Sequence, residues 1–436
     1  MKLIQIFTFA FIVVSASIGA SAQVENIPIS RIAERYVKLV LAIGEHEPGY
    51  VDAYYGPKNW QNEVRADKPS LTNLKTEAIT LSAALKPHGE TTKPGIAKQR
   101  LHFLAKQLIA VHTRISILQG QKFSFDEETR LLFDAVVPEI KKSDLDTALT
   151  KLDTLVGGDG SLQERFVAYR AQFTIPKDKL RAVFAAAINA CKTRTEKFIP
   201  LPEGESFTSE FVTDKAWSGY NWYQGAAKSL IQVNTDFPSF IDSAVNLGCH
   251  EGYPGHHVFN AMLESNLVNK RGWIEFSVYP LYSPQSLLAE GTASYARFMA
   301  FPGDSQSEFE ATKLFPLAGM DAGKKGEKAK QYFDTLKAIA DLRYARVEGA
   351  RRYIDGKLSR DELVDWLARY QLISRERAEQ GVRFIEKYRG YVINYTLGSD
   401  LTAAYVARYG GTGHKQRWSA YETLLSTPLT ASMLVN

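Results

Sequence analysis

Apolar side chains recur at helical spacing along most of the chain. In residues 29–43 one helical face collects Ile32, Val37, Leu39, Val40 and Ile43. Residues 96–118 repeat this spacing with Leu101, Leu104, Leu108 and Val111. The pattern is typical of amphipathic helices, so it predicts a mainly α-helical protein.

Helix starts and turns can also be assigned. Three Ser-x-x-Glu sequences predict capping boxes, in which the serine oxygen and the glutamate satisfy free backbone amides: Ser124 with Glu127, Ser161 with Glu164, and Ser359 with Glu362. Proline and glycine clusters at 86–89, 93–95 and 157–160 predict turns between helices of a bundle.

The helical pattern lapses between residues 198 and 215. We place a domain boundary there, which gives an N-terminal helical subdomain over 23–200 and a catalytic subdomain over 201–436. The short, β-branched segment 229–234 then predicts a strand. The expected fold is mainly α, with a small β-sheet beside the helix of the active site.

The first 22 residues have the features of a secretory signal peptide. Lys2 precedes an apolar run over residues 3–14, and small residues follow at 20–22. The run is short for a bilayer of about 30 Å, although an uncleaved anchor is the alternative. We therefore predict a periplasmic or secreted protein without stable membrane insertion after cleavage.

Composition excludes several classes of protein. The chain has 436 residues, of which 45% are hydrophobic and 23% charged, as in ordinary globular proteins. A net charge of +5 without a basic stripe argues against a nucleic-acid partner. The two cysteines, Cys191 and Cys249, are either one disulfide bridge or two buried thiols.

Residues 248–257 hold three of the eight histidines, in the sequence Gly-Cys-His-Glu-Gly-Tyr-Pro-Gly-His-His. Neutral imidazole is the commonest zinc ligand, and Glu251 follows His250 where a metal hydrolase needs a general base. Pro254 prevents a straight helix through this stretch. His257 returns to the face of His250 but lies about 10.5 Å farther along the axis, whereas His256 is nearer and about 120° out of phase. Either histidine can therefore be the second ligand, and the other would then support the ligands or face the substrate.

A third ligand is expected in a downstream helix, with Ser283 as its N-cap and Pro284 at its first position. Glu290 lies on an apolar part of this helix, where a carboxylate is costly to bury unless it is paired or bound to a metal. Two histidines, Glu290 and a water molecule would complete a four-coordinate Zn²⁺ site, with one zinc per chain.

The motif H-E-x-x-P-G-H-H at 250–257, followed by E-G-x-A-x-Y at 290–295, resembles the bacterial domain-of-unknown-function family 885, which is grouped with the gluzincin-like metallopeptidases. Residues 391–398 are similar to a later segment of that family, so that the resemblance extends over about 217–406. It implies a gluzincin-like architecture in which His250, one or both of His256 and His257, and Glu290 surround a metal, with Glu251 as the general base.

The resemblance also implies two roles in substrate binding. Tyr395 would hydrogen-bond the oxyanion of the tetrahedral intermediate. The strand 229–234 would be the sheet edge that pairs with an extended peptide. One departure matters: many family members carry an Asp and a His in the helix before the last capping box, whereas residues 346–354 contain no histidine. Specificity, or activity itself, is therefore expected to differ.

Two further groups of residues are open to more than one interpretation. The polar and aromatic segment 44–57 either lines a substrate cleft or forms a structural loop. Four arginines either bind a substrate carboxylate or form the solvated face of a helix: Arg343, Arg346, Arg351 and Arg352.

These observations together predict an exported zinc-dependent hydrolase of gluzincin type that acts on a peptide or a small amide. The alternatives are a metal-dependent hydrolase of non-peptide amides or esters, and a helical binding protein with a vestigial site. The sequence leaves the oligomeric state open.

Overall fold

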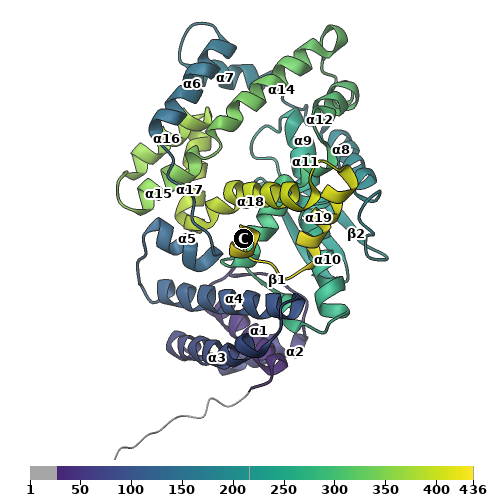
Figure 1. The fold of residues 1–436 in the computed structure, drawn as a ribbon. Coiled ribbons are helices and arrows are strands. Elements are labelled where there is room, and N and C mark those ends of the chain that lie inside the picture. Colours follow the sequence, from purple (N-terminus) through teal and green to yellow (C-terminus); the bar gives the residue numbers. More distant parts are fainter. Residues whose placement is uncertain (1–26, 216, 436) are drawn as a thin grey trace, which may run out of the picture.

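The computed structural model describes residues 27–215 and 217–435, and it is mainly helical with two small sheets, as predicted (Figure 1). The predicted signal peptide, residues 1–22, lies outside the described residues. Within the described part of the chain, no helix is both long and apolar enough to cross a membrane.

The N-terminal helices are α1 (Ile29–His46), α2 (Lys58–Asp67), α3 (Leu71–Thr91), α4 (Ile96–Leu118), α5 (Phe125–Phe133), α6 (Lys142–Val156), α7 (Leu162–Ala171) and α8 (Leu180–Thr195). Of these, α1 to α4 form the lower part of Figure 1, whereas α6 and α7 lie at its upper left. The capping boxes predicted at Ser124 and Ser161 begin α5 and α7. The turn predicted at 86–89 is wrong, because α3 continues through Pro87 and its last turn is held by a hydrogen bond between His88 Nε2 and the carbonyl of Ile27, 2.8 Å apart.

The larger sheet consists of β2 (Ser206–Val212), β3 (Gly219–Gly225) and β4 (Lys228–Asn234), in the order β2-β4-β3. The strand predicted at 229–234 is confirmed as β4. Its predicted role as the peptide-pairing edge is wrong, because β4 is the central strand and pairs with β2 on one side and β3 on the other. The smaller sheet pairs β1 (Val51–Tyr54) with β5 (Val278–Pro280).

The remaining helices follow the larger sheet. The first group is α9 (Ile241–Leu247), the π-helical turn η1 (Gly248–Gly252), α10 (His256–Leu263), α11 (Pro284–Ala300), α12 (Ser305–Phe309), α13 (Phe315–Ala318) and α14 (Glu327–Ile339). The second group is α15 (Ala345–Ile354), α16 (Arg360–Gln371), α17 (Arg375–Tyr388), α18 (Ile393–Gly410), α19 (His414–Ser426) and α20 (Ala431–Leu434). Helix α11 begins after Ser283 with Pro284 in its first turn, and α16 begins with the third capping box, both as predicted.

Two hydrophobic cores hold these elements together. One joins the N-terminal helices to α15, α16 and α17, and the other surrounds α8, α10, α11 and α19. Each core draws residues from both sides of residue 200. A disulfide between Cys191 of α8 and Cys249 of η1, with Cα atoms 5.6 Å apart, resolves the two alternatives for the cysteines in favour of a bridge.

Helices α11 and α18 approach each other most closely at two glycines. A Cβ atom at Gly291 would lie 2.4 Å from the carbonyl carbon of Gly398, and a Cβ at Gly398 would lie 2.7 Å from the carbonyl oxygen of Leu287. Both distances are shorter than van der Waals contact, so any side chain at either position would force the two helices apart.

We expect Gly398→Ala to lower the free energy of unfolding by about 1–3 kcal/mol, the usual cost of overpacking a core. Chemical denaturation of the purified protein measures this change. Gly89→Ala is the matched control, because Gly89 is also helical and its Cβ would meet open space. The control should be neutral or slightly stabilising. Equal stability of Gly398→Ala and the wild type would contradict close packing at this crossing.

Candidate metal centre

The helical conformation ends at Gly252, and Tyr253 is extended just before Pro254, so no straight helix runs through this stretch, as the sequence predicts; a helix resumes at His256. His250 therefore lies on η1, whereas His256 is the first residue of α10. Glu290 projects towards both histidines from α11, which packs against η1 and α10.

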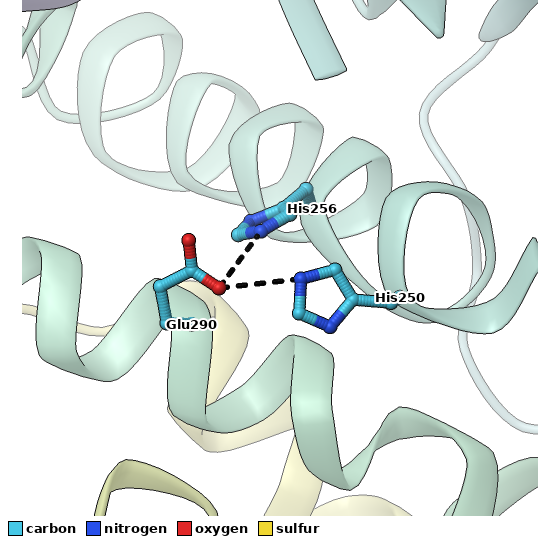
Figure 2. Close-up of side chains that lie close together, drawn as sticks. All are labelled: His250, His256 and Glu290. Carbon is cyan, nitrogen blue, oxygen red and sulfur yellow. Dashed lines mark ion pairs between the residues drawn. The ribbon is translucent and has the colours of Figure 1, made fainter. Parts of the chain in front are cut away.

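Figure 2 shows that the three side chains converge on one point. Glu290 Oε2 lies 3.2 Å from His250 Nε2 and 3.5 Å from His256 Nε2. One ligand-type atom from each residue lies within 4.8 Å of the others. Zinc bonds of about 2.0–2.1 Å in tetrahedral geometry place ligand atoms about 3.3 Å apart. The residues present thus fit a divalent metal ion.

Glu290 is prepared to bind a cation. Its Oε1 accepts a hydrogen bond from the Tyr391 hydroxyl at 2.8 Å, whereas its buried Oε2 accepts no hydrogen bond of regular geometry among the described residues. Burial acts to raise the pKa of Glu290, but His256 and His250 outweigh it and hold this pKa well below its usual range. The carboxylate is therefore ionised at neutral pH and presents one unshared oxygen to the centre.

His257, the other candidate ligand, points away from this centre. Its Nδ1 lies 2.8 Å from Ser229 Oγ on β4, and its Nε2 lies 2.8 Å from Glu205 Oε2. Successive residues of an α-helix point about 100° apart, so His256 and His257 cannot face the same point. The structure brings His250, His256 and Glu290 together and leaves His257 in a separate, buried network.

Glu205 is the centre of that network. Besides His257, its carboxylate accepts hydrogen bonds from Lys192 Nζ at 2.7 Å and from the Tyr253 hydroxyl at 2.6 Å. Burial acts to raise the pKa of Glu205, but these three hydrogen bonds outweigh it and lower the pKa to about 2. The network connects α8 and the segment before β2 to α10, and so fixes the start of the helix that carries His256.

Glu251, the predicted general base, is buried beside the centre. The carbonyl of Glu251 accepts a hydrogen bond from Asn221 Nδ2 of β3 at 2.7 Å. Its carboxylate lies against Gly219, where an added Cβ would be only 2.8 Å from Oε1. Burial raises the pKa of Glu251 to about 7, although the neighbouring His250 acts to lower it. A carboxyl group with a pKa near neutrality is suited to both accepting and donating a proton.

A cleft of about 760 Å³ opens over the centre. Its walls come from β1, β3, η1, α11, α15, α17 and α18, and they include Glu251 and Tyr395. The ring of Tyr395 stacks at 6.3 Å from the ring of His250, so this predicted catalytic residue lies in the cleft beside a candidate ligand.

Sequence reasoning assigned no role to two residues of this site. Tyr391, which orients Glu290, lies one helical turn before Tyr395. This spacing places both tyrosines on one side of the chain, and it was the sequence signal that could have identified Tyr391. Asp52 lies in the cleft wall and accepts a hydrogen bond from the Tyr220 hydroxyl at 2.6 Å. Burial raises the pKa of Asp52 to about 6. Asp52 belongs to the segment 44–57, which lines the cleft through Glu47, Gly49 and Asp52.

Comparison with known proteins identifies structural relatives only. No family model matches the sequence, and neither does any curated protein. The fold is similar to that of a candidate lipoprotein from Colwellia psychrerythraea, with a TM-score of 0.53, 13% identity, and coverage of 84% of this chain and 68% of that chain. At this identity the similarity concerns the fold alone.

Two further solved structures show weaker similarity. A candidate lipoprotein of unknown function from Shewanella oneidensis has a TM-score of 0.48 and 11% identity, covering 92% of this chain and 81% of that chain. An M32 carboxypeptidase from Deinococcus radiodurans has a TM-score of 0.35 and 11% identity, covering 91% of this chain and 88% of that chain.

Purified protein should contain about one zinc ion per chain by elemental analysis. His250→Ala, His256→Ala and Glu290→Ala should each lose it, because each removes one of three protein ligands. His257→Ala is the matched control and should retain the metal. Loss of zinc from a folded His257→Ala protein, with retention in His256→Ala, would contradict the assignment.

The Glu205 network should make stability sensitive to acid. Because the pKa of Glu205 is lower in the folded state than in the unfolded state, its ionised carboxylate stabilises the fold above about pH 4.5. This stabilisation is lost as the pH falls towards 2. Glu205→Gln should therefore be less stable than the wild type at pH 6, on the order of 2 kcal/mol, since solvent screens part of the network. Denaturation at pH 6 and pH 3 measures this difference, and a difference that does not shrink at pH 3 would contradict it.

Proposed function

We propose that this protein is a zinc-dependent hydrolase that cleaves peptide bonds. The observation that carries the proposal is the convergence of His250, His256 and Glu290 within 4.8 Å, beside a buried Glu251 and at the base of a large cleft. The resemblance of the motifs at 250–257 and 290–295 to family 885 supports the same activity.

A zinc ion held by these three residues would acidify a water molecule and polarise a carbonyl group. Glu251 then serves as the general base, which takes a proton from the attacking water and returns it to the leaving nitrogen. Its pKa of about 7 suits both transfers. The Tyr395 hydroxyl is the candidate donor to the oxyanion.

The edge strand β3 supports a peptide as the substrate. Among the described residues β3 pairs only with β4, so its other side has backbone groups that could pair with an extended chain. Ser218, Gly219 and Tyr220 also line the cleft, next to Glu251. The peptide-pairing role that the sequence suggested for β4 is thus assigned to β3.

We further propose that the mature protein works outside the cytoplasm. The predicted signal peptide supports export, and the Cys191–Cys249 disulfide is typical of an oxidising compartment. The expected partner is a peptide or small amide, without nucleic acid.

Glu251→Gln should lower kcat/KM on a peptide substrate by about four orders of magnitude or more, because glutamine cannot accept the proton. Zinc content and stability of this variant should match the wild type, since Glu251 is not a ligand in this geometry. Assays on a peptide library and on small amides measure the activity. Unchanged hydrolysis by Glu251→Gln would contradict the proposed mechanism, and hydrolysis of small amides alone would exclude peptides as the substrate.

A further inference from the structure

Arg346 of α15 is a cation in the cleft wall with no anionic partner. Its guanidinium lies over the ring of Phe384, 4.4 Å from the ring centroid. Its Nε atom is buried and has no hydrogen-bond partner, and Arg346 forms no ion pair within the described residues. Guanidinium remains protonated in proteins, so a positive charge is held here at the cost of lost hydration.

The neighbouring arginines are all paired. Arg343 binds Asp400, and Arg352 binds Glu348, each at 2.8 Å. Arg351 binds Glu348 at 2.8 Å and Asp126 at 3.0 Å. Of the four arginines that the sequence singled out as potential carboxylate ligands, the one without a partner is therefore the one that faces the cleft.

The carboxylates of the cleft are already engaged. Glu290 faces the two histidines, Asp52 accepts from Tyr220, and Glu47 is paired with Arg114. Glu251 lies on η1 beside the metal centre. Among the described residues none of them forms an ion pair with Arg346, so an anionic group of a ligand in the cleft can pair with this guanidinium.

The guanidinium lies in the same cleft as the metal centre. Phe384, which it covers, has its ring 6.3 Å from that of Tyr395, and Tyr395 in turn stacks 6.3 Å from His250. Two aromatic side chains thus connect Arg346 to a metal ligand along the cleft wall. A peptide bound in this cleft can therefore contact both the metal centre and Arg346.

We propose that Arg346 binds the α-carboxylate at the C-terminus of a peptide substrate, which makes the enzyme an exopeptidase that cleaves peptides near the C-terminus. This inference rests on the proposed function. Water adds its oxygen to the carbonyl carbon, the C–N bond breaks, and the proton passes to the leaving nitrogen. The C-terminal product departs with a free amine and with the carboxylate that Arg346 held. Arg377 and Lys387 of α17 line the same cleft and add positive charge to it.

Binding is tested separately from catalysis. Calorimetry on zinc-loaded Glu251→Gln protein compares three N-acetylated tripeptides: one with a free C-terminal carboxylate, its C-terminal amide, and an amide that ends in glutamate. The free acid should bind about tenfold to a hundredfold more tightly than either amide, because a charge-assisted pair is lost in both. The third peptide distinguishes a terminal carboxylate from an acidic side chain.

Adding Arg346→Gln to this protein should abolish the preference, and Arg346→Lys should restore part of it. Arg343→Gln is the matched control, because its side chain is half exposed and paired with Asp400, and it should keep the full preference. Equal binding of acid and amide by the Arg346-intact protein would overturn the inference, as would a preference that survives Arg346→Gln.

Activity then separates the two proposals. With Glu251 intact, Arg346→Gln should raise KM for the free acid much more than it lowers kcat/KM for an amidated peptide. An equal loss on both peptides would overturn the inference, because it would indicate a role in the reaction or in folding, while the hydrolase itself stands. Preferential binding of the free acid without cleavage of any peptide would support the carboxylate site and refute the proposed function.

Discussion

The close contact between Gly291 and Gly398 is the constraint on which the site depends. Glu290 directly precedes Gly291 on α11, and Tyr395 lies one turn before Gly398 on α18. With no side chain at either glycine, the two backbones meet, and the carboxylate and the hydroxyl-bearing ring are brought into one cleft. Tyr391, which precedes α18, completes the arrangement by donating its hydrogen bond to Glu290. Gly291 in the motif 290–295 and Gly398 in the segment 391–398 therefore have a packing role, which explains why each lies beside functional residues.

Around this crossing of α11 and α18, the surroundings of the glutamates give their carboxyl groups different pKa values. Glu290 faces two imidazoles and remains ionised, whereas Glu251 is buried without a hydrogen-bonded cation and has a pKa of about 7. Such a separation of pKa values distinguishes a metal ligand from a proton carrier. Glu205, although also partly buried, is hydrogen-bonded by three donors and serves packing. The role of each acid thus follows from what faces it, which the residue type alone does not reveal.

Local signals predicted much of this structure, and pairings distant in sequence account for what was missed. The capping boxes, the strand β4 and the break at Pro254 depend on neighbouring residues, so the sequence contained their causes. The choice between His256 and His257 depends on Ser229 and Glu205, which lie 28 and 52 positions from His257. The central position of β4 likewise results from its parallel pairing with β2, and the local sequence of a strand does not predict which strand it pairs with in parallel. Asp52 reaches the cleft only because β1 pairs with β5, more than two hundred residues later.

The same reasoning separates Arg346 from the other arginines of its segment. Helix α15 is docked by Arg351, which binds Asp126 of α5 and the carbonyl of Val137, while Glu348 pairs with Arg351 and Arg352 within the helix. These pairs stabilise the helix, so Arg346 is not needed to hold it in place. A guanidinium that faces a cleft and has lost part of its hydration destabilises the free protein, and an anion would recover that free energy on binding. Placing such a charge in the same cleft as the metal centre therefore favours substrates that end there in a carboxylate over chains that continue.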